Sequence, residues 1–107
     1  MSFIDLERVA PKEVFEGSRI RVAAGERVML SLMDLDAHAR VPVHSHPHEQ
    51  AGMVLEGMFE LTIGGETRIV RKGDCYICPP DVEHSVDVAD APARVLDIFS
   101  PPRDEYR

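Results

Sequence analysis

The chain has 107 residues, of which 44% are apolar, and a formal net charge of -7. This length suits one domain that buries its own core, so we expect residues 1–107 to form a single domain. The negative charge and the scattered Lys and Arg argue against a nucleic acid partner. Because no apolar stretch approaches the ~20 residues of a membrane span, we expect no membrane association either.

The N-terminal segment places Asp5, Glu7 and Arg8 among apolar residues. It lacks the layout of a secretory signal, in which a charged region precedes an apolar one. We therefore expect a cytoplasmic location. The first 16 residues are compatible with either a short strand or a turn, and the sequence does not decide between them.

The rest of the chain is a series of short runs rich in Val, Ile, Leu, Met and Phe, none with the apolar spacing of a helix. Gly and Pro separate the runs, a pattern that predicts many short strands and an all-β barrel or sandwich. Between two of them stands Gly64-Gly65, which predicts a hairpin. The barrel core is expected over about residues 20–100, with strands at 20–23, 27–34, 51–56, 58–63, 67–70, 75–78, 84–88 and 94–99.

Four of the five histidines fall in two places, three of them at positions 44, 46 and 48 and one at position 84. On a strand, His44 and His46 would point to the same face, as two ligands of one metal must. Gln50 follows the turn at Pro47 and offers a neutral oxygen, and His84 begins a later strand. Taken singly, each histidine fits the protein surface equally well. Together the four ligands predict a site for one divalent transition metal: Zn, Ni, Mn, Fe or Co.

Other residues of the same chemical types are expected to play no direct part. We interpret His48 as a residue at the rim of the site, Glu49 as solvated and His38 as exposed. Cys75 and Cys78 lie three apart on an expected strand, so their side chains should point to opposite faces. Two unpaired thiols are the simplest interpretation of this pair.

The last expected strand leaves two orientations open. Asp97 shares one face with Val95 and Phe99, and the other face is apolar too. Asp97 is therefore either solvated or directed into the barrel near the metal, where its carboxyl group could transfer protons. The tail after Pro101-Pro102 is equally open, because Arg103 is either a solvated cation or part of a segment that folds back on the barrel.

The spacing of these residues resembles the two motifs of the cupin family. The first cupin motif has two His, a Glu and a Gly, and its counterpart here is His44-x-His46, Gln50 and Gly57. The second is matched by Gly73, Pro79, Asp81 and His84. Gln50 replaces the usual Glu and Asp81 replaces a Gly. The resemblance implies a double-stranded β-helix (a jelly-roll barrel) and a homodimer.

The C-terminal pattern Asp97-x-Phe99-x-x-x-Arg103, beside these metal ligands, resembles the KdgF family of small pectin-degradation cupins. That resemblance implies an enzyme for the ring opening and ketonisation of 4,5-unsaturated uronates from pectin or alginate. It further implies that Asp97 transfers the proton, that Arg103 holds the carboxylate of this sugar acid and that Phe99 forms an apolar wall.

Two other functions remain open at this point. One is a metal-dependent cupin dioxygenase, which would use Fe(II); Gln50 counts weakly against it because such sites favour His with or without a carboxylate. The other is a non-catalytic cupin that binds a ligand as a sensor, and the lack of an attached DNA-binding segment weakens a transcriptional role.

Overall fold

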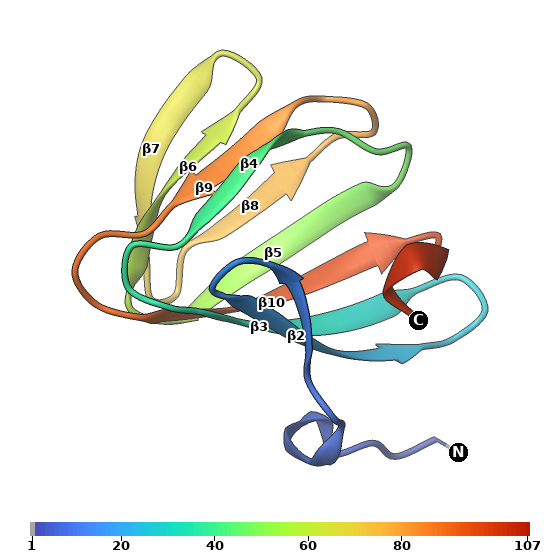
Figure 1. Cartoon of the computed structure of the whole chain (residues 1–107). Coiled ribbons are helices and arrows are strands. Elements are labelled where there is room, and N and C mark those ends of the chain that lie inside the picture. Colours follow the sequence, from blue (N-terminus) through green and yellow to red (C-terminus); the bar gives the residue numbers. More distant parts are fainter. Residues whose placement is uncertain (1) are drawn as a thin grey trace.

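The computed structural model describes residues 2–107, which form ten strands in two antiparallel sheets. The larger sheet has the order β1 (Lys12–Phe15), β2 (Ser18–Ala24), β3 (Met29–Leu35), β10 (Ala93–Ser100), β5 (Glu49–Glu56) and β8 (Cys75–Cys78). The smaller sheet has the order β4 (Arg40–His44), β9 (His84–Asp87), β6 (Met58–Ile63) and β7 (Glu66–Arg71). Figure 1 shows the two sheets facing each other as an open jelly-roll sandwich, which confirms the predicted all-β fold.

All eight expected strands are present, and the structure adds β1 and β4. The open choice for the first residues is resolved in favour of both elements, a 3₁₀ turn η1 (Leu6–Arg8) followed by β1; Met1 lies outside the described residues. Strand β4 contains Pro42 and buries only Val41, so it lacks a clear alternation of apolar and polar residues. This weak pattern explains why residues 40–43 were not predicted as a strand, although the spacing of His44 and His46 assumed one at the histidines.

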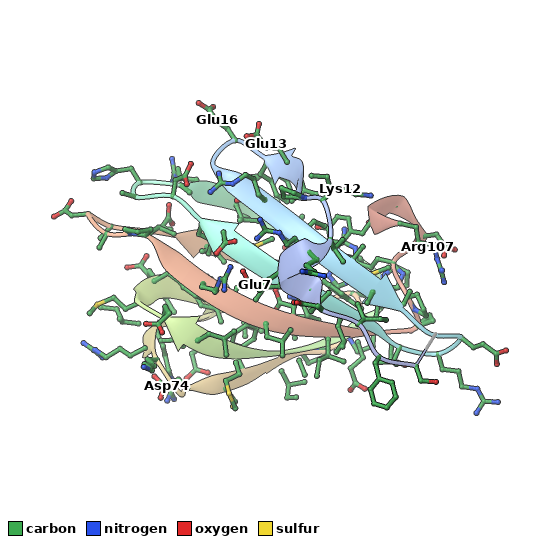
Figure 2. The ribbon with its side chains drawn as sticks, turned by 90° about the horizontal axis from the view of Figure 1, so that it is seen from below. Glu7, Lys12, Glu13, Glu16, Asp74 and Arg107 are labelled. Carbon is green, nitrogen blue, oxygen red and sulfur yellow. The ribbon has the colours of Figure 1, made fainter. Side chains whose placement is uncertain are left out.

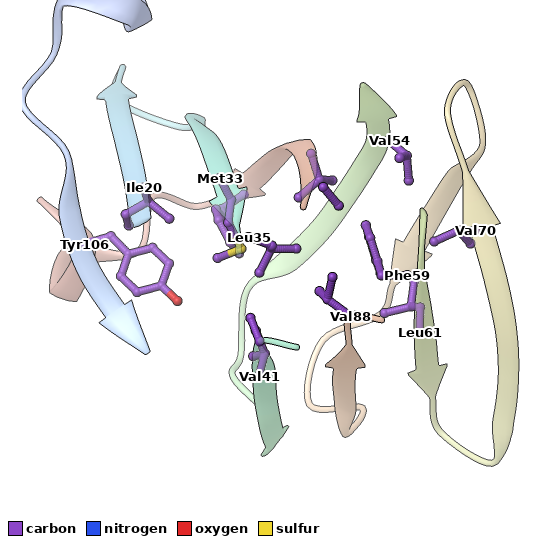
Figure 3. Packing of buried hydrophobic residues seen from close by; sticks show 14 of the residues in the cluster. Ile20, Met33, Leu35, Val41, Val54, Phe59, Leu61, Val70, Val88 and Tyr106 are labelled. Carbon is purple, nitrogen blue, oxygen red and sulfur yellow. The ribbon is translucent and has the colours of Figure 1, made fainter. Parts of the chain in front are cut away.

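The core lies between the sheets and arises from alternation along each strand. In β10, Val95, Asp97 and Phe99 are buried, whereas Ile98 on the other face is 38% exposed. In Figure 3, core side chains of the two sheets point toward one another, Phe59 and Leu61 among them. Each large apolar side chain buried in this way contributes about 1.5–3 kcal/mol. The same packing directs Asp97 inward, because it shares its face with Val95 and Phe99.

The hairpin predicted at Gly64-Gly65 is confirmed, since Ile63 pairs with Glu66 in the β6–β7 ladder. Of the two glycines in this turn, only Gly64 has a positive φ, at 59°. The two thiols also lie as expected, with Cys75 exposed, Cys78 buried and both unpaired.

The outer face of the larger sheet carries charged side chains and the N-terminal turn. Arg94 of β10 forms ion pairs with Asp34 of β3 and with Glu7 of η1, so the N-terminal segment is held to this sheet. Figure 2 shows η1 lying across that face. Among residues 2–107, no helix is long and apolar enough to cross a membrane.

Candidate metal centre

Three histidines meet at one end of the sandwich. His44, the last residue of β4, lies opposite His84, the first residue of β9, in the register of the smaller sheet. His46 follows in the bend between β4 and β5, and its ring centroid is 5.0 Å from that of His84. One ring nitrogen from each of the three lies within 4.8 Å of the others. This is close enough for all three to bind a single ion.

The reason for this proximity differs from our expectation. We predicted that His44 and His46 share a strand face, but β4 ends at His44. His46 is instead directed inward by the bend that follows β4. Its carbonyl oxygen accepts a 2.8 Å hydrogen bond from the Asp81 amide. Asp81 has a φ of 67°, the left-handed region that Asp tolerates better than most residues. The cupin motif commonly has Gly at this position, so the replacement keeps the conformation that a Gly would provide.

Backbone carbonyls orient two of the imidazoles. His44 Nδ1 lies 2.8 Å from the Pro42 carbonyl oxygen, and His84 Nδ1 lies 2.9 Å from that of Val82. A carbonyl oxygen only accepts, so each Nδ1 must carry the proton and each Nε2 is left with a free lone pair. His84 Nε2 is buried and has no hydrogen-bond partner. A metal ion would satisfy it, and this outer hydrogen bonding is typical of metal-binding histidines.

The protonation state suits metal binding as well. Burial, and to a smaller extent the nearby Arg103 guanidinium, lowers the pKa of His46 to about 4. Burial also lowers the pKa of His84. Both rings are therefore neutral near pH 7, which is the form that binds metals.

Gln50 brings an oxygen to the same point. It is buried on β5, and its Oε1 lies 3.0 Å from His46 Nε2. In the larger sheet Gln50 pairs with Phe99 on one side and Cys78 on the other. All four predicted ligands are thus brought together, and the donor set of three imidazoles and one amide oxygen fits a divalent transition metal.

Asp97 lies next to this cluster and is supported by a residue that we did not predict. The Tyr76 hydroxyl donates a 2.6 Å hydrogen bond to Asp97 Oδ1. Gly52 stands between the two in the sheet register, and a Cβ built on it would lie 2.3 Å from the Tyr76 ring. Only a residue without a side chain lets Tyr76 reach Asp97 across β5. A glycine inside a strand is the sequence signal that could have indicated this close approach.

The electrostatics of Asp97 follow from its position. It is 4% exposed, and burial raises its pKa to about 6, against the opposing effects of the Tyr76 hydroxyl, Gln50 and Arg103. Burial and the Asp97 charge also raise the pKa of the Cys78 thiol to about 12. Asp97 is therefore the group of this pair that can exchange a proton near neutral pH.

Arg103 and Phe99 lie close to Asp97 and line the same cavity. Arg103 is only 7% exposed, so it is not the solvated cation that its charged neighbours suggested. Its guanidinium stacks over the Tyr106 ring at 4.0 Å and over the Phe99 ring at 5.3 Å. Phe99 also lies edge-on to His46, with ring centroids 5.7 Å apart. The tail folds back on the sandwich, and Figure 1 shows its final turn at the end of the molecule where the β4–β5 loop lies.

These groups line one cavity of about 40 Å³, room for a few water molecules. The polar side chains of its lining are those of His44, Gln50, Tyr76, His84, Asp97 and Arg103. The larger hollows elsewhere lie over charged loops or strand surfaces, and of these six residues Tyr76 alone borders one of them.

The residues that we expected to play no direct part lie at the rim of the cluster or on the surface. His48 is half-buried with its ring centroid 5.4 Å from that of His46, which places it at the rim. Glu49 is exposed. His38 is exposed too, with Asp90 as its nearest charged neighbour at 3.6 Å.

Comparison with known proteins agrees with the fold and with this arrangement. Residues 31–99 match the family model described as Cupin domain. The chain belongs to the cupin family.

Within the cupins, the chain is similar to KdgF. It is 36% identical over 64 residues to the pectin degradation protein KdgF of Dickeya dadantii, a match that covers 59% of this chain and 58% of that relative. The solved structure of KdgF from Halomonas sp. superposes with a TM-score of 0.92 at 28% identity, covering 100% of this chain and 99% of the other. An RmlC-like cupin from Shewanella frigidimarina gives a TM-score of 0.93 at 25% identity, covering 100% and 96%. The predicted resemblance to a KdgF-like cupin is confirmed.

Proposed function

We propose that this cupin is a metal-dependent enzyme that opens and ketonises 4,5-unsaturated uronates released from pectin or alginate. One observation carries the proposal: a buried carboxyl group, Asp97, and a buried guanidinium, Arg103, line the same cavity as His44 and His84 of the histidine cluster. The similarity to two KdgF proteins supports the substrate class. The reaction rearranges protons and bonds within the substrate, so it needs no oxidant.

His44, His46, Gln50 and His84 would hold the metal. A divalent ion bound there supplies a Lewis acid for a substrate oxygen. All four ligands are neutral, so the protein would leave the charge of the ion uncompensated and its pull on that oxygen strong.

Asp97 is the proton-transfer residue in this proposal. Its pKa of about 6 lets it both accept and donate protons near neutral pH. The hydrogen bond from the Tyr76 hydroxyl to Oδ1 holds the carboxyl group in place. Because Asp97 is buried, bulk water would compete little for the transferred proton.

Arg103 and Phe99 would bind and orient the sugar. A guanidinium offers a planar fork of donors that matches a carboxylate, so Arg103 suits the acid group of a uronate. Phe99 lies between Arg103 and His46 and presents an apolar face. Together they would place the ring with its carboxylate toward the tail and its reacting atoms toward Asp97.

The test follows the absorbance of the 4,5-double bond in a pectate or alginate lyase product. Zinc-loaded protein should accelerate the loss of this absorbance over buffer. Asp97→Asn, which keeps the size and an oxygen for Tyr76, should slow that loss by about 10²–10⁴-fold, the usual contribution of acid–base catalysis. Asp90→Asn is the matched control, because Asp90 lies in an exposed loop away from the cavity.

Wild type that does no better than buffer, or an Asp97→Asn variant as fast as wild type, would contradict the proposal. Oxygen uptake by the Fe(II)-loaded protein would favour the dioxygenase alternative. Uronate binding without any change in absorbance would favour the sensor.

A further inference from the structure

The last residues of the chain place a carboxylate of their own on Arg103, one of the residues that line the cavity. The 3₁₀ turn η2 (Asp104–Tyr106) directly follows Arg103. Arg103 Nε donates a 2.8 Å hydrogen bond to Glu105 Oε1, and Arg103 Nη2 donates to the same oxygen. The Nε and Nη2 edge of the guanidinium is therefore already engaged by an acid group.

The two partners differ in exposure. The Arg103 side chain is 9% exposed, whereas that of Glu105 is 59% exposed. Arg103 is fixed between the Phe99 and Tyr106 rings, so it is the buried and stationary partner. Glu105 approaches from the solvent side and can leave without exposing a buried charge. Water solvates the released carboxylate, but the buried guanidinium then needs another carboxylate in its place.

The turn that carries Glu105 is anchored by Tyr106, which is 7% exposed and packs against Phe99 with ring centroids 5.8 Å apart, whereas the Glu105 side chain is bonded to Arg103. No strand pairs with this turn, and Lys12 Nζ of β1 donates a 2.8 Å hydrogen bond to the Tyr106 carbonyl oxygen. Figure 2 shows Lys12 beside this turn and Arg107 at its end. By contrast, β10 in the wall of the cavity pairs along its length with β3 and β5. Of the groups around Arg103, the Glu105 side chain, which is 59% exposed, is therefore the one that can move at least cost.

The cavity is also too small to hold a sugar in its present form. At about 40 Å³ it is far smaller than the roughly 300 Å³ or more of a typical small-molecule site. A sugar ring therefore enters only if part of the lining moves outward.

We propose that Glu105 takes the place of a ligand carboxylate on Arg103, and that an incoming carboxylate displaces it. This inference rests on the proposed function, since it assigns Arg103 to an acidic ligand. Its consequence is specific: Glu105 competes with the ligand and weakens the binding of acids, while neutral sugars gain no such advantage when it is removed.

The test is a calorimetric titration of zinc-loaded protein with galacturonate, a saturated uronate without the 4,5-double bond. Glu105→Gln keeps the size of the side chain but removes the competing charge. It should tighten galacturonate binding about fivefold, the ratio that corresponds to about 1 kcal/mol. Asp104→Asn is the control, because Asp104 pairs with exposed Arg107 and not with Arg103. It should bind as wild type does.

Galactose, which lacks the carboxylate, should show no difference between wild type and Glu105→Gln. Binding of galacturonate that is unchanged or weaker in Glu105→Gln would overturn the inference, because Glu105 would then only hold Arg103 in position. Failure of both proteins to bind galacturonate would overturn it as well. Tighter binding by Glu105→Gln in a protein that leaves the 4,5-double bond untouched would instead support the inference and refute the proposed activity.

Discussion

A single missing side chain determines the surroundings of Asp97. Gly52 lies between Asp97 and Tyr76 in the sheet, and a Cβ at this position would stand 2.6 Å from Asp97 Oδ1 and 2.4 Å from the Tyr76 hydroxyl. Both contacts are much closer than real Cβ atoms allow. The hydrogen bond between Tyr76 and Asp97 thus depends on a glycine that takes no part in it.

Gly52→Ala should therefore force Tyr76 and Asp97 apart. We expect a loss of about 1–3 kcal/mol in the free energy of unfolding, the usual cost of overpacking a core, measured by urea denaturation. Turnover of the unsaturated uronate should fall with it. Gly65→Ala is the control, because a Cβ at Gly65 would meet nothing within 4 Å. Equal stability of the two variants would contradict this account.

Tyr76 can be tested separately from the glycine. Tyr76→Phe keeps the ring but removes the hydroxyl that donates to Asp97 Oδ1. A buried carboxyl group that loses its donor should cost about 1–3 kcal/mol of stability. Urea denaturation of this variant measures the cost directly, and a stability equal to wild type would show that the hydrogen bond is unimportant.

Among the elements, the turn before β9 shows how a departure from the motif is accommodated. Asp81 adopts the left-handed conformation in which a Gly is usual, and its amide is bonded to the His46 carbonyl. This hydrogen bond connects the two chain segments that carry His46 and His84. The conformation of the turn is therefore part of what assembles the histidine cluster.

Substitutions at Asp81 should separate conformation from side-chain chemistry. Asp81→Ala should lower the free energy of unfolding by about 1 kcal/mol, because Ala tolerates a positive φ less well than Asp. Asp81→Gly should stay within about 0.5 kcal/mol of wild type, since Gly takes this φ freely but loses more entropy on folding. Thermal or urea unfolding gives both values. If Gly destabilised as much as Ala, the aspartate side chain itself would be what matters.

For the whole molecule, a metal at one end of the sandwich should stabilise the fold. Its ligands come from β4, the following bend, β5 and β9, so binding would tie both sheets together. Addition of zinc to chelator-treated protein should raise the melting temperature by several degrees, since ligand at 100 times Kd stabilises by about 2.7 kcal/mol.

His84→Ala should abolish this zinc-dependent rise. His38→Ala should keep it, because His38 is exposed and lies outside the cluster. Scanning calorimetry with and without zinc distinguishes the variants. A rise that persists in His84→Ala would place the metal elsewhere.

The oligomeric state of the protein is also a prediction. Strands β1 and β8 end the larger sheet, and β4 and β7 end the smaller one. Open edges of this kind favour pairing between chains. From the cupin resemblance we expect a homodimer, so light scattering should give about 24 kDa, twice the 12.0 kDa of the chain. A mass of one chain would contradict it.

Local patterns were sufficient to predict most of the fold. Alternating apolar residues and glycine turns predicted eight of the ten strands and the β6–β7 hairpin, because alternation and turn chemistry act over neighbouring residues. Strand β4 was missed, since only Val41 of its five residues is buried. The spacing of His44, His46, Gln50 and His84 likewise selected a set that the structure brings together.

Only the tertiary structure decided what depends on contacts between distant strands. The sequence by itself determined an all-β cupin chain and its candidate ligands, since these follow from residue type and spacing. It left Asp97 facing either way, because both faces of β10 are apolar in sequence and only the opposing sheet makes one of them the inside. The contact of Tyr76 with Asp97 and the engagement of Arg103 by Glu105 depend on side chains meeting in space, which no periodicity records.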